Sequence, residues 1–350
     1  MDFDIGRVRF DGRRTVVVAE AGVNHLGRFD YAEELIRTAA RAGADIIKFQ
    51  TYKAAKLTTR DAPRFWSWEG EKEEKGSQYD SYSLLDSFGL DQYRQLKALC
   101  DKYDIEFLST PFDEEAADLL VEVGSRGFKM ASCDLNNLPF LAYVAKKGLP
   151  MLLSTGASTI AEIKQAVDVI EATGNRQICI MHCTLCYPTE PKDSNLSAIH
   201  DIATNFPGYL LGLSDHTLGT IVPAASVLYG VRVIEKHYTF DKELPLSADH
   251  WLSLDEKQLK QMVDDVRVLE AAIGGGKKVL LECETPAHKF ARRSVVAARS
   301  IAAGAILGAD DLAVKRPGTG LPPQFLDRLV GRTATRALEA DTLLTLEDIR

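Results

Sequence analysis

The apolar residues of this chain gather in short runs rich in β-branched side chains, and amphipathic stretches separate most of the runs. Runs of this kind, bounded by polar or turn-forming residues, are typical of buried strands. We predict eight strands, at residues 15–20, 45–50, 105–110, 127–132, 150–155, 177–183, 209–214 and 231–237.

Three of the intervening stretches carry clear helix signals. Apolar residues recur at helical spacing over residues 31–42, and Gly43 follows as a stop. Asp113 is a suitable N-cap for a helix over residues 113–123, because its carboxylate can accept a hydrogen bond from a free backbone N–H. A third helix is predicted over residues 160–172.

Eight strand–helix units predict a (β/α)8 TIM barrel over residues 1–282, which is close to the usual size of that fold. A doubly wound open sheet is the alternative. The barrel is favoured because the strands number eight and no G-x-G-x-x-G motif follows the first of them. Beyond a linker at residues 283–290, short β-branched pieces alternate with Gly and Pro turns, so residues 291–350 are predicted to form a small β-rich domain.

Each predicted strand ends in polar residues. In a barrel of this type the carboxyl ends of all strands open on one face, and the active site is built there. Polar endings on eight apolar strands therefore predict a site. They are Glu20, Lys48, Gln50, Ser109, Thr110, Lys129, Ser132, Ser154, Thr155, His182, Thr184, Ser214, His216, Glu235 and His237.

Residues 211–240 carry the sharpest signal. They read as strand, loop, helix and strand, and place His216 and His237 at the ends of two successive strands. Successive parallel strands are neighbours, so both imidazoles should face one crevice. Together with Glu235 and Lys236, they predict a divalent metal site beside an anion site.

Composition narrows the class of protein. A hydrophobic fraction of 45% and a charged fraction of 26% are ordinary for a soluble domain, and a net charge of −8 does not suggest a nucleic acid or an anionic membrane as partner. No apolar run approaches a membrane span, and the start lacks a signal-peptide core, so we predict a cytoplasmic protein. Cys183 and Cys186 form a C-x-x-C pair, which we interpret as free thiols rather than a redox or zinc site.

The second connection, residues 53–90, is long and rich in charge and aromatic residues such as Trp68 and Tyr82. A long loop in a compact domain is usually functional or disordered. We expect it to cover a polyol substrate, with residues 246–251 covering the same crevice from the other side.

Eight stretches taken in order give the chain a close resemblance to the N-acetylneuraminate (sialic acid) synthase family. They are AEAGVNHLG (19–27), DIIKFQT (45–51), FLSTPFD (107–113), FKMAS (128–132), LLSTGAS (152–158), MHCTLCYPT (181–189), GLSDHTLG (212–219) and IEKHYT (234–239). Residues 292–320, ending in KRPGTG, resemble the antifreeze-like (SAF) domain that follows the barrel in this family. The resemblance covers nearly the whole chain.

The resemblance implies an enzyme that condenses phosphoenolpyruvate with an N-acylated aldose, such as N-acetylmannosamine, to give a nonulosonic acid and phosphate. It implies catalytic roles for Glu20 and Glu235, and a divalent metal, most often Mn²⁺ with Mg²⁺ or Co²⁺ as alternatives, on His216 and His237. Phosphoenolpyruvate would be bound by Lys48, Thr110, Lys129, Ser132, Ser154, Tyr187 and Ser214. The sugar would lie near Gln50, Tyr82 and Asp249, and Arg316 would reach its acyl group from the SAF domain of a partner in a domain-swapped homodimer.

Two departures from the family pattern bear on the substrate. Leu185 stands where some sialic acid synthases have an Asn that helps to hold phosphoenolpyruvate. Residues 245–249 are one residue longer than the family's Pro-Gly-Pro-Asp loop, which faces the sugar. The identity of the sugar is therefore left open, and a legionaminic or pseudaminic acid type of synthase is an alternative.

Two rivals remain. A 3-deoxy-acid synthase would act on a phosphorylated aldose, and the basic residues Lys53, Lys56, Arg60 and Arg64 of the long connection do not exclude it. A non-catalytic carbohydrate-binding protein is disfavoured, because such a protein has no need of a metal beside an anion site.

Overall fold

The computed structural model describes residues 2–66, 76–86, 88–244 and 249–350. Trp68 of the long connection, and residues 245–248 of the longer loop, lie outside the described residues. The chain divides into two compact units, Met1–Gly274 and Gly275–Arg350, which are described separately.

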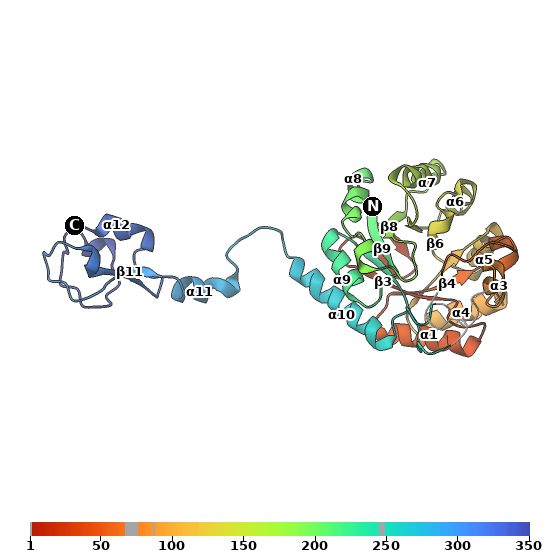
Figure 1. Cartoon of the computed structure of the whole chain (residues 1–350), viewed down its shortest axis with the longest axis horizontal. Coiled ribbons are helices and arrows are strands. Elements are labelled where there is room, and N and C mark those ends of the chain that lie inside the picture. Colours follow the sequence, from red (N-terminus) through yellow and green to blue (C-terminus); the bar gives the residue numbers. More distant parts are fainter. Residues whose placement is uncertain (1, 67–75, 87, 245–248) are drawn as a thin grey trace. The chain divides into compact units, whose positions relative to one another are not determined.

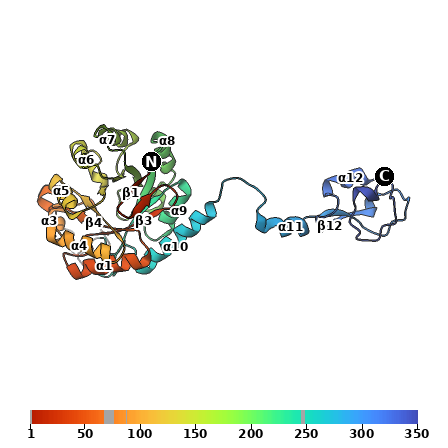
Figure 2. The same cartoon turned by 180° about the vertical axis from the view of Figure 1, so that it is seen from behind.

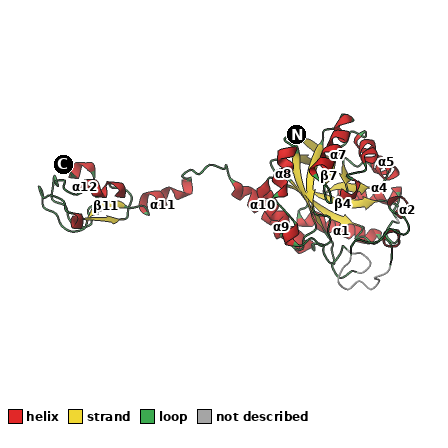
Figure 3. Cartoon of the chain, turned by 45° about the horizontal axis from the view of Figure 1, so that its top comes forward, coloured by secondary structure: helices red, strands yellow, loops and turns green. Residues whose placement is uncertain are grey.

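The first unit is built on an eight-stranded parallel sheet ringed by helices (Figures 1 and 3). Its hydrogen-bonded order is β5-β4-β3-β10-β9-β8-β7-β6, and β5 lies beside β6, so the sheet closes. The predicted barrel is confirmed, and the open doubly wound sheet is excluded. The strands are β3 (Val16–Gly22), β4 (Ile46–Thr51), β5 (Glu106–Pro111), β6 (Phe128–Met130), β7 (Met151–Ser154), β8 (Ile178–Cys183), β9 (Leu210–Asp215) and β10 (Val233–His237).

The helices cover the outside of the sheet. Where the sequence predicted an N-cap, the Asp113 carboxylate accepts a hydrogen bond from the N–H of Ala116 at 2.8 Å. The predicted helix after β9 is α-helical only to Ala225, and then tightens into a 3₁₀ turn, η3 (Ser226–Tyr229). The helices that follow the strands are α1 (Phe29–Ala42), α4 (Leu90–Lys102), α5 (Glu114–Val123), α6 (Leu138–Ala145), α7 (Ile160–Ala172), α8 (Ala198–Asn205), the short α9 (Ile221–Ala225) and α10 (Glu256–Ile273).

Strand alternation divides the buried residues of the barrel into two layers. Side chains such as Ile47, Leu213 and Ile234 point outward and pack between strands and helices. Residues of the other parity, such as Val16 and Ile46, point inward and form an apolar plug at the amino ends of the strands. At the carboxyl ends the same inward rows become polar, and these ends hold the site.

An antiparallel hairpin of β1 (Phe3–Ile5) and β2 (Val8–Phe10) closes the base of the barrel (Figure 2). It was not predicted from the sequence, although apolar and polar residues alternate in both strands. At this base the buried Glu106 carboxylate accepts hydrogen bonds from the N–H groups of Arg7 and Phe107, at 3.0 and 3.1 Å. Gly6 has φ +57°, and a Cβ there would collide with the same carboxylate.

The second unit is small and has its own core of residues such as Val295, Leu312 and Leu344. Its ladder is β11 (Ser294–Ala297) paired antiparallel with β12 (Leu312–Lys315). The segment predicted as a linker is not extended throughout, since it holds the helix α11 (Thr285–Phe290) after the 3₁₀ turn η4 (Glu282–Glu284). Further short turns are η5 (Ala309–Asp311), η6 (Pro323–Phe325), α12 (Leu326–Leu329) and η7 (Leu346–Asp348).

Candidate active site

Four buried charges of alternating sign lie at the carboxyl end of the barrel interior. Lys48 Nζ is 2.7 Å from Glu20 Oε2 and 3.8 Å from Glu235 Oε1, and Lys129 Nζ is 3.6 Å from the same Glu235 oxygen. Each residue is the inward-facing member of its strand, so four strands, β3, β4, β6 and β10, bring them together. Such a cluster can receive an anionic substrate without a large solvation penalty, because its cations are already held in place.

The two carboxylates have pKa values pushed in opposite directions. Burial raises the pKa of Glu20 to about 7, and the attraction of Lys48 only partly offsets it. Burial would also raise the pKa of Glu235, but Lys129 and Lys48 outweigh burial and lower it. Environments that separate two titratable groups in this way assign them different roles. Glu20 can exchange a proton near neutral pH, while Glu235 stays an anion.

Hydroxyl groups surround the four charges. Thr110 accepts a hydrogen bond from Lys48 Nζ at 3.0 Å, and Ser214 donates to Glu235 Oε1 at 3.1 Å. Ser132 accepts from the N–H of Gly156 at 2.9 Å, and a Cβ on Gly156 would lie 2.9 Å from that hydroxyl. Among the described residues, Ser154 Oγ and Glu235 Oε2 are buried atoms without a hydrogen-bond partner. Buried polar atoms of this kind need a partner, and a bound ligand can supply one.

His216 and His237 lie beside this cluster, with ring centroids 5.5 Å apart. His216 Nδ1 donates to the Thr184 carbonyl at 2.9 Å, which leaves its Nε2 lone pair available. Burial lowers the pKa of His237 well below its usual value, so its ring is neutral, and its Nδ1 is buried with no hydrogen-bond partner. Burial would also lower the pKa of His216, but Cys183 and the Thr184 carbonyl outweigh burial and raise it. An imidazole binds a metal through a ring nitrogen that carries no proton, and the buried, unpartnered Nδ1 of His237 is an atom that fits such an ion. Within the described residues, no group of three or more His, Cys, Asp or Glu side chains is arranged for a metal.

Three more predicted residues lie beside the histidines or the charged cluster. The Tyr187 ring is 4.1 Å from that of His216, and Asp249 Oδ2 is 3.7 Å from His237 Nδ1. Burial raises the pKa of Asp249 to about 6. Gln50 donates to Glu20 Oε1 at 2.9 Å.

Two predicted residues come from other parts of the chain. Tyr82 belongs to α3 (Gln78–Ser83) in the long connection, and its ring is 5.4 Å from that of Tyr52. Arg316 follows β12 in the second unit, and the structure places it only within that unit.

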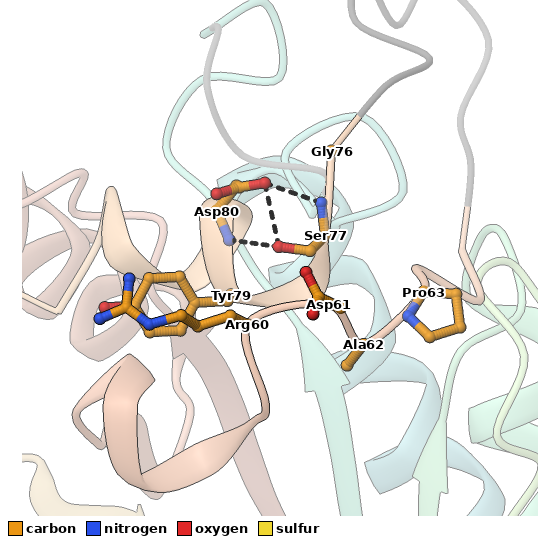
Figure 4. Close-up of a pocket in the computed structure, with 8 residues that line it drawn as sticks. All are labelled: Arg60, Asp61, Ala62, Pro63, Gly76, Ser77, Tyr79 and Asp80. Atoms are coloured by element: carbon orange, nitrogen blue, oxygen red, sulfur yellow. Dashed lines mark hydrogen bonds between the residues drawn. The ribbon is translucent and has the colours of Figure 1, made fainter.

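A separate pocket of about 510 Å³ lies on the long connection itself (Figure 4). Asp80 and Ser77 form a reciprocal helix cap there, and the guanidinium of Arg60 lies 5.1 Å from the Tyr79 ring centre. No predicted site residue lines it. The pocket forms where the connection folds back on itself, and there the backbone N–H of Gln78 donates to the Ala62 carbonyl at 2.8 Å.

Sequence reasoning missed two neighbours of the site and misplaced a third. Cys183 Sγ is 4.0 Å from His216 Nδ1, and Asp215 lies behind the histidines. Lys236, predicted to lie in the crevice beside the metal site, instead points outward from the barrel and forms an ion pair with Asp215. Strand alternation could have shown these positions, because Cys183 has the inward parity of the site residues, whereas Asp215 and Lys236 have the outward parity.

Comparison with known proteins gives consistent matches. The NeuB family matches residues 35–278, and the SAF domain matches residues 292–350. The N,N′-diacetyllegionaminic acid synthase of Legionella pneumophila is 37% identical over 95% of this chain and 94% of its own length. The N-acetylneuraminate-9-phosphate synthase of Mus musculus is 34% identical, over 95% and 92%. The structure of N-acetylneuraminic acid (sialic acid) synthetase from Leptospira borgpetersenii, in complex with citrate, aligns with a TM-score of 0.72 at 31% identity, over 82% of this chain and 94% of that one.

Proposed function

Because this chain belongs to the NeuB family, it is a phosphoenolpyruvate-dependent synthase of the nonulosonic acid type, and we propose that its sugar substrate is a free N-acylated aldose. The observation that carries this is the cluster of Glu20, Lys48, Lys129 and Glu235, which has unpartnered buried atoms and lies beside the imidazoles of His216 and His237. A phosphate and a carboxylate need cations and hydroxyl donors, and an aldehyde needs a polarising group.

Lys48 and Lys129 would hold the two anionic groups of phosphoenolpyruvate. Their present partners are Glu20 and Glu235, so a bound substrate would join an existing charge network rather than meet a lone buried ammonium. The hydroxyls of Thr110, Ser132, Ser154 and Ser214, and the Tyr187 side chain, would complete the anion site.

Glu20 would act as the general base that accepts a proton from water. C3 of phosphoenolpyruvate bonds to the aldehyde carbon, water adds to C2, and phosphate leaves. The water must lose a proton, and a carboxylate with a pKa near neutral can accept it. Glu235, which stays anionic, would stabilise the positive charge that develops at C2.

His216 and His237 would hold a divalent metal, most suitably Mn²⁺, with Mg²⁺ or Co²⁺ as alternatives. When bound, such an ion supplies Lewis-acid polarisation of a carbonyl oxygen. Protein treated with a chelator should lose activity and recover it with Mn²⁺. Full activity after verified metal removal would contradict this assignment.

The long connection favours an unphosphorylated sugar, which would lie near Gln50, Tyr82 and Asp249. Lys53 Nζ donates to the backbone carbonyls of Asp86 and Phe88, and Lys56 pairs with Glu115. These two lysines are therefore already engaged, and Arg60 lies over the Tyr79 ring in the separate pocket that no predicted site residue lines. A mass spectrum of the product from phosphoenolpyruvate and a panel of free and phosphorylated N-acyl hexoses tests this. Preferred turnover of the phosphorylated sugars would favour the rival enzyme class.

A homodimer would complete the site, with Arg316 of a partner's SAF domain reaching the acyl group. A guanidinium donates to a carbonyl in a geometry that lysine reproduces poorly. Glu20→Ala and Arg316→Ala variants, mixed and allowed to exchange subunits, should regain activity through hybrids that carry one intact site. Confirmed exchange without activity would limit Arg316 to its own subunit.

No described helix is long and apolar enough to cross a membrane. All six cysteines are free thiols, which supports a reducing compartment, and we place the enzyme in the cytoplasm.

A further inference from the structure

Lys236 and Asp215 form a buried ion pair in a layer that is mostly apolar. Lys236 Nζ donates to Asp215 Oδ2 at 2.6 Å, and the two side chains are 0% and 3% exposed. Both side chains point outward from the barrel. Lys236 shares its face of β10 with Ile234, and Asp215 shares its face of β9 with Leu213; these two apolar residues pack under the helices. Two apolar side chains of similar size would fill this place without desolvating a charge.

The pair stands directly behind the two histidines. Asp215 precedes His216, Lys236 precedes His237, and Asp215 is opposite Lys236 in the last register pair of the β9–β10 ladder. The backbone ladder between these strands therefore ends before His216.

Lys236 extends this connection past the end of the ladder. Its ammonium also donates to the Thr217 carbonyl, and the Thr217 hydroxyl donates to Asp215 Oδ2 at 2.8 Å. One lysine on β10 thus holds the residues on both sides of His216. On the opposite side, the His216 carbonyl accepts from the N–H of Thr189 at 3.0 Å.

A buried ion pair is weak evidence for a stabilising role, because its desolvation cost can exceed the attraction, and an apolar pair is often as stable. We propose that Lys236 and Asp215 are positioning residues that set the separation of His216 and His237. The proposal rests on the proposed function of these histidines as metal ligands. Residues behind metal ligands typically change metal affinity about 10–100-fold when they are replaced.

The test uses the single variants Lys236→Met and Asp215→Asn and the double variant Asp215→Asn/Lys236→Met. Mn²⁺ binding to each purified, chelator-treated full-length protein is measured by calorimetry, and unfolding by thermal melts. All three variants should lose Mn²⁺ affinity by a similar factor of about 10 or more, because each breaks the same link. The single variants should melt lower than the double variant, which leaves no unpaired buried charge.

Two controls separate positioning from folding. Ile234→Val, on the same strand and in the same layer, should lower the melting temperature slightly and leave Mn²⁺ affinity unchanged. His216→Ala should abolish Mn²⁺ binding. The positioning role would be wrong if the double variant recovered both melting temperature and Mn²⁺ affinity, or if the variants bound Mn²⁺ like the wild type. Either result would leave the metal assignment intact. Failure of the wild-type protein to bind Mn²⁺, or unchanged binding by His216→Ala, would overturn the metal assignment together with it.

Discussion

A buried glutamate lies at each end of the barrel interior, and the two differ in how completely their carboxylate oxygens are hydrogen-bonded. At the base, Glu106 is 3% exposed and accepts hydrogen bonds from two backbone N–H groups. It also pairs with the guanidinium of Arg7, whose Nε lies 3.6 Å from Glu106 Oε2. At the carboxyl end, Glu235 is 5% exposed, yet its Oε2 has no hydrogen-bond partner in the described residues.

The difference separates a carboxylate that holds the fold together from one that can bind a ligand. A buried carboxylate with both oxygens bonded ties the hairpin to the barrel, whereas a buried carboxylate with one unpartnered oxygen keeps that atom available to a ligand. The histidines follow the same division, since the inward His237 Nδ1 has no hydrogen-bond partner among the described residues, whereas Lys236 and Asp215 behind them bond to each other and to Thr217. A substitution at the base should therefore change stability, and one at the carboxyl end should change catalysis.

The largest effect is expected from Glu20→Gln. Loss of the proton acceptor should lower kcat about 10²–10⁴-fold. Because burial already favours the neutral form of Glu20, the free energy of unfolding should change little. Steady-state kinetics and urea unfolding measure the two quantities.

Glu106→Gln is the matched variant at the base. It should leave kcat unchanged and lower the free energy of unfolding by about 1–3 kcal/mol, because two hydrogen bonds to a charged group are weakened. If Glu106→Gln reduced kcat as strongly as Glu20→Gln, the division between the two ends would be wrong.

Lys129→Met should raise the KM for phosphoenolpyruvate about 10–100-fold, the range expected for a lost charge-assisted contact, with a much smaller change in the KM for the sugar. Lys147→Met is the control, since Lys147 pairs with Asp118 at the surface. Equal increases in both KM values would count against a phosphoenolpyruvate contact.

Gly6→Ala should destabilise the fold without altering kcat. Gly6 and Gly124 both have positive φ, at +57° and +91°, and a methyl group at either costs about 1–2 kcal/mol of backbone strain. Only at Gly6 would the methyl displace the Glu106 carboxylate, whereas a Cβ at Gly124 meets nothing within 4 Å. Gly6→Ala should therefore unfold at lower denaturant than Gly124→Ala. Equal midpoints would show that the Glu106 contact contributes nothing.

The last prediction concerns the pH dependence of catalysis. A base must be deprotonated to act, and Glu20 has its pKa raised to about 7, so kcat/KM should fall roughly tenfold per unit as the pH drops below that value. An ordinary glutamate would keep full activity to about pH 5. A profile flat between pH 5 and 7 would assign the proton to another group.

Much of the fold could be read along the chain because strands and helices leave regular patterns. The eight predicted strands match the observed ones to within about two residues at each end, since buried parallel strands are nearly continuous apolar runs. The hairpin β1–β2 was missed because each strand has only three residues. The helix α11 was missed because it buries no residue and therefore has no apolar face to mark it in the sequence, so a linker was predicted there.

The positions of the site residues at strand ends follow from the amino-acid sequence, because the period of two and the polar endings are local properties. These residues are Glu20, Lys48, Lys129, His216, Glu235 and His237. Which of them contact one another depends on how the strands pair in space. Lys48 of β4 meets Glu20 on the neighbouring strand β3, and pairing of β3 with β10 brings Glu235 to the same lysine, although most of the barrel sequence separates Glu235 from both residues. The opposite pKa shifts of the two glutamates follow from that meeting, because burial and neighbouring charge depend on distances through space and not along the chain.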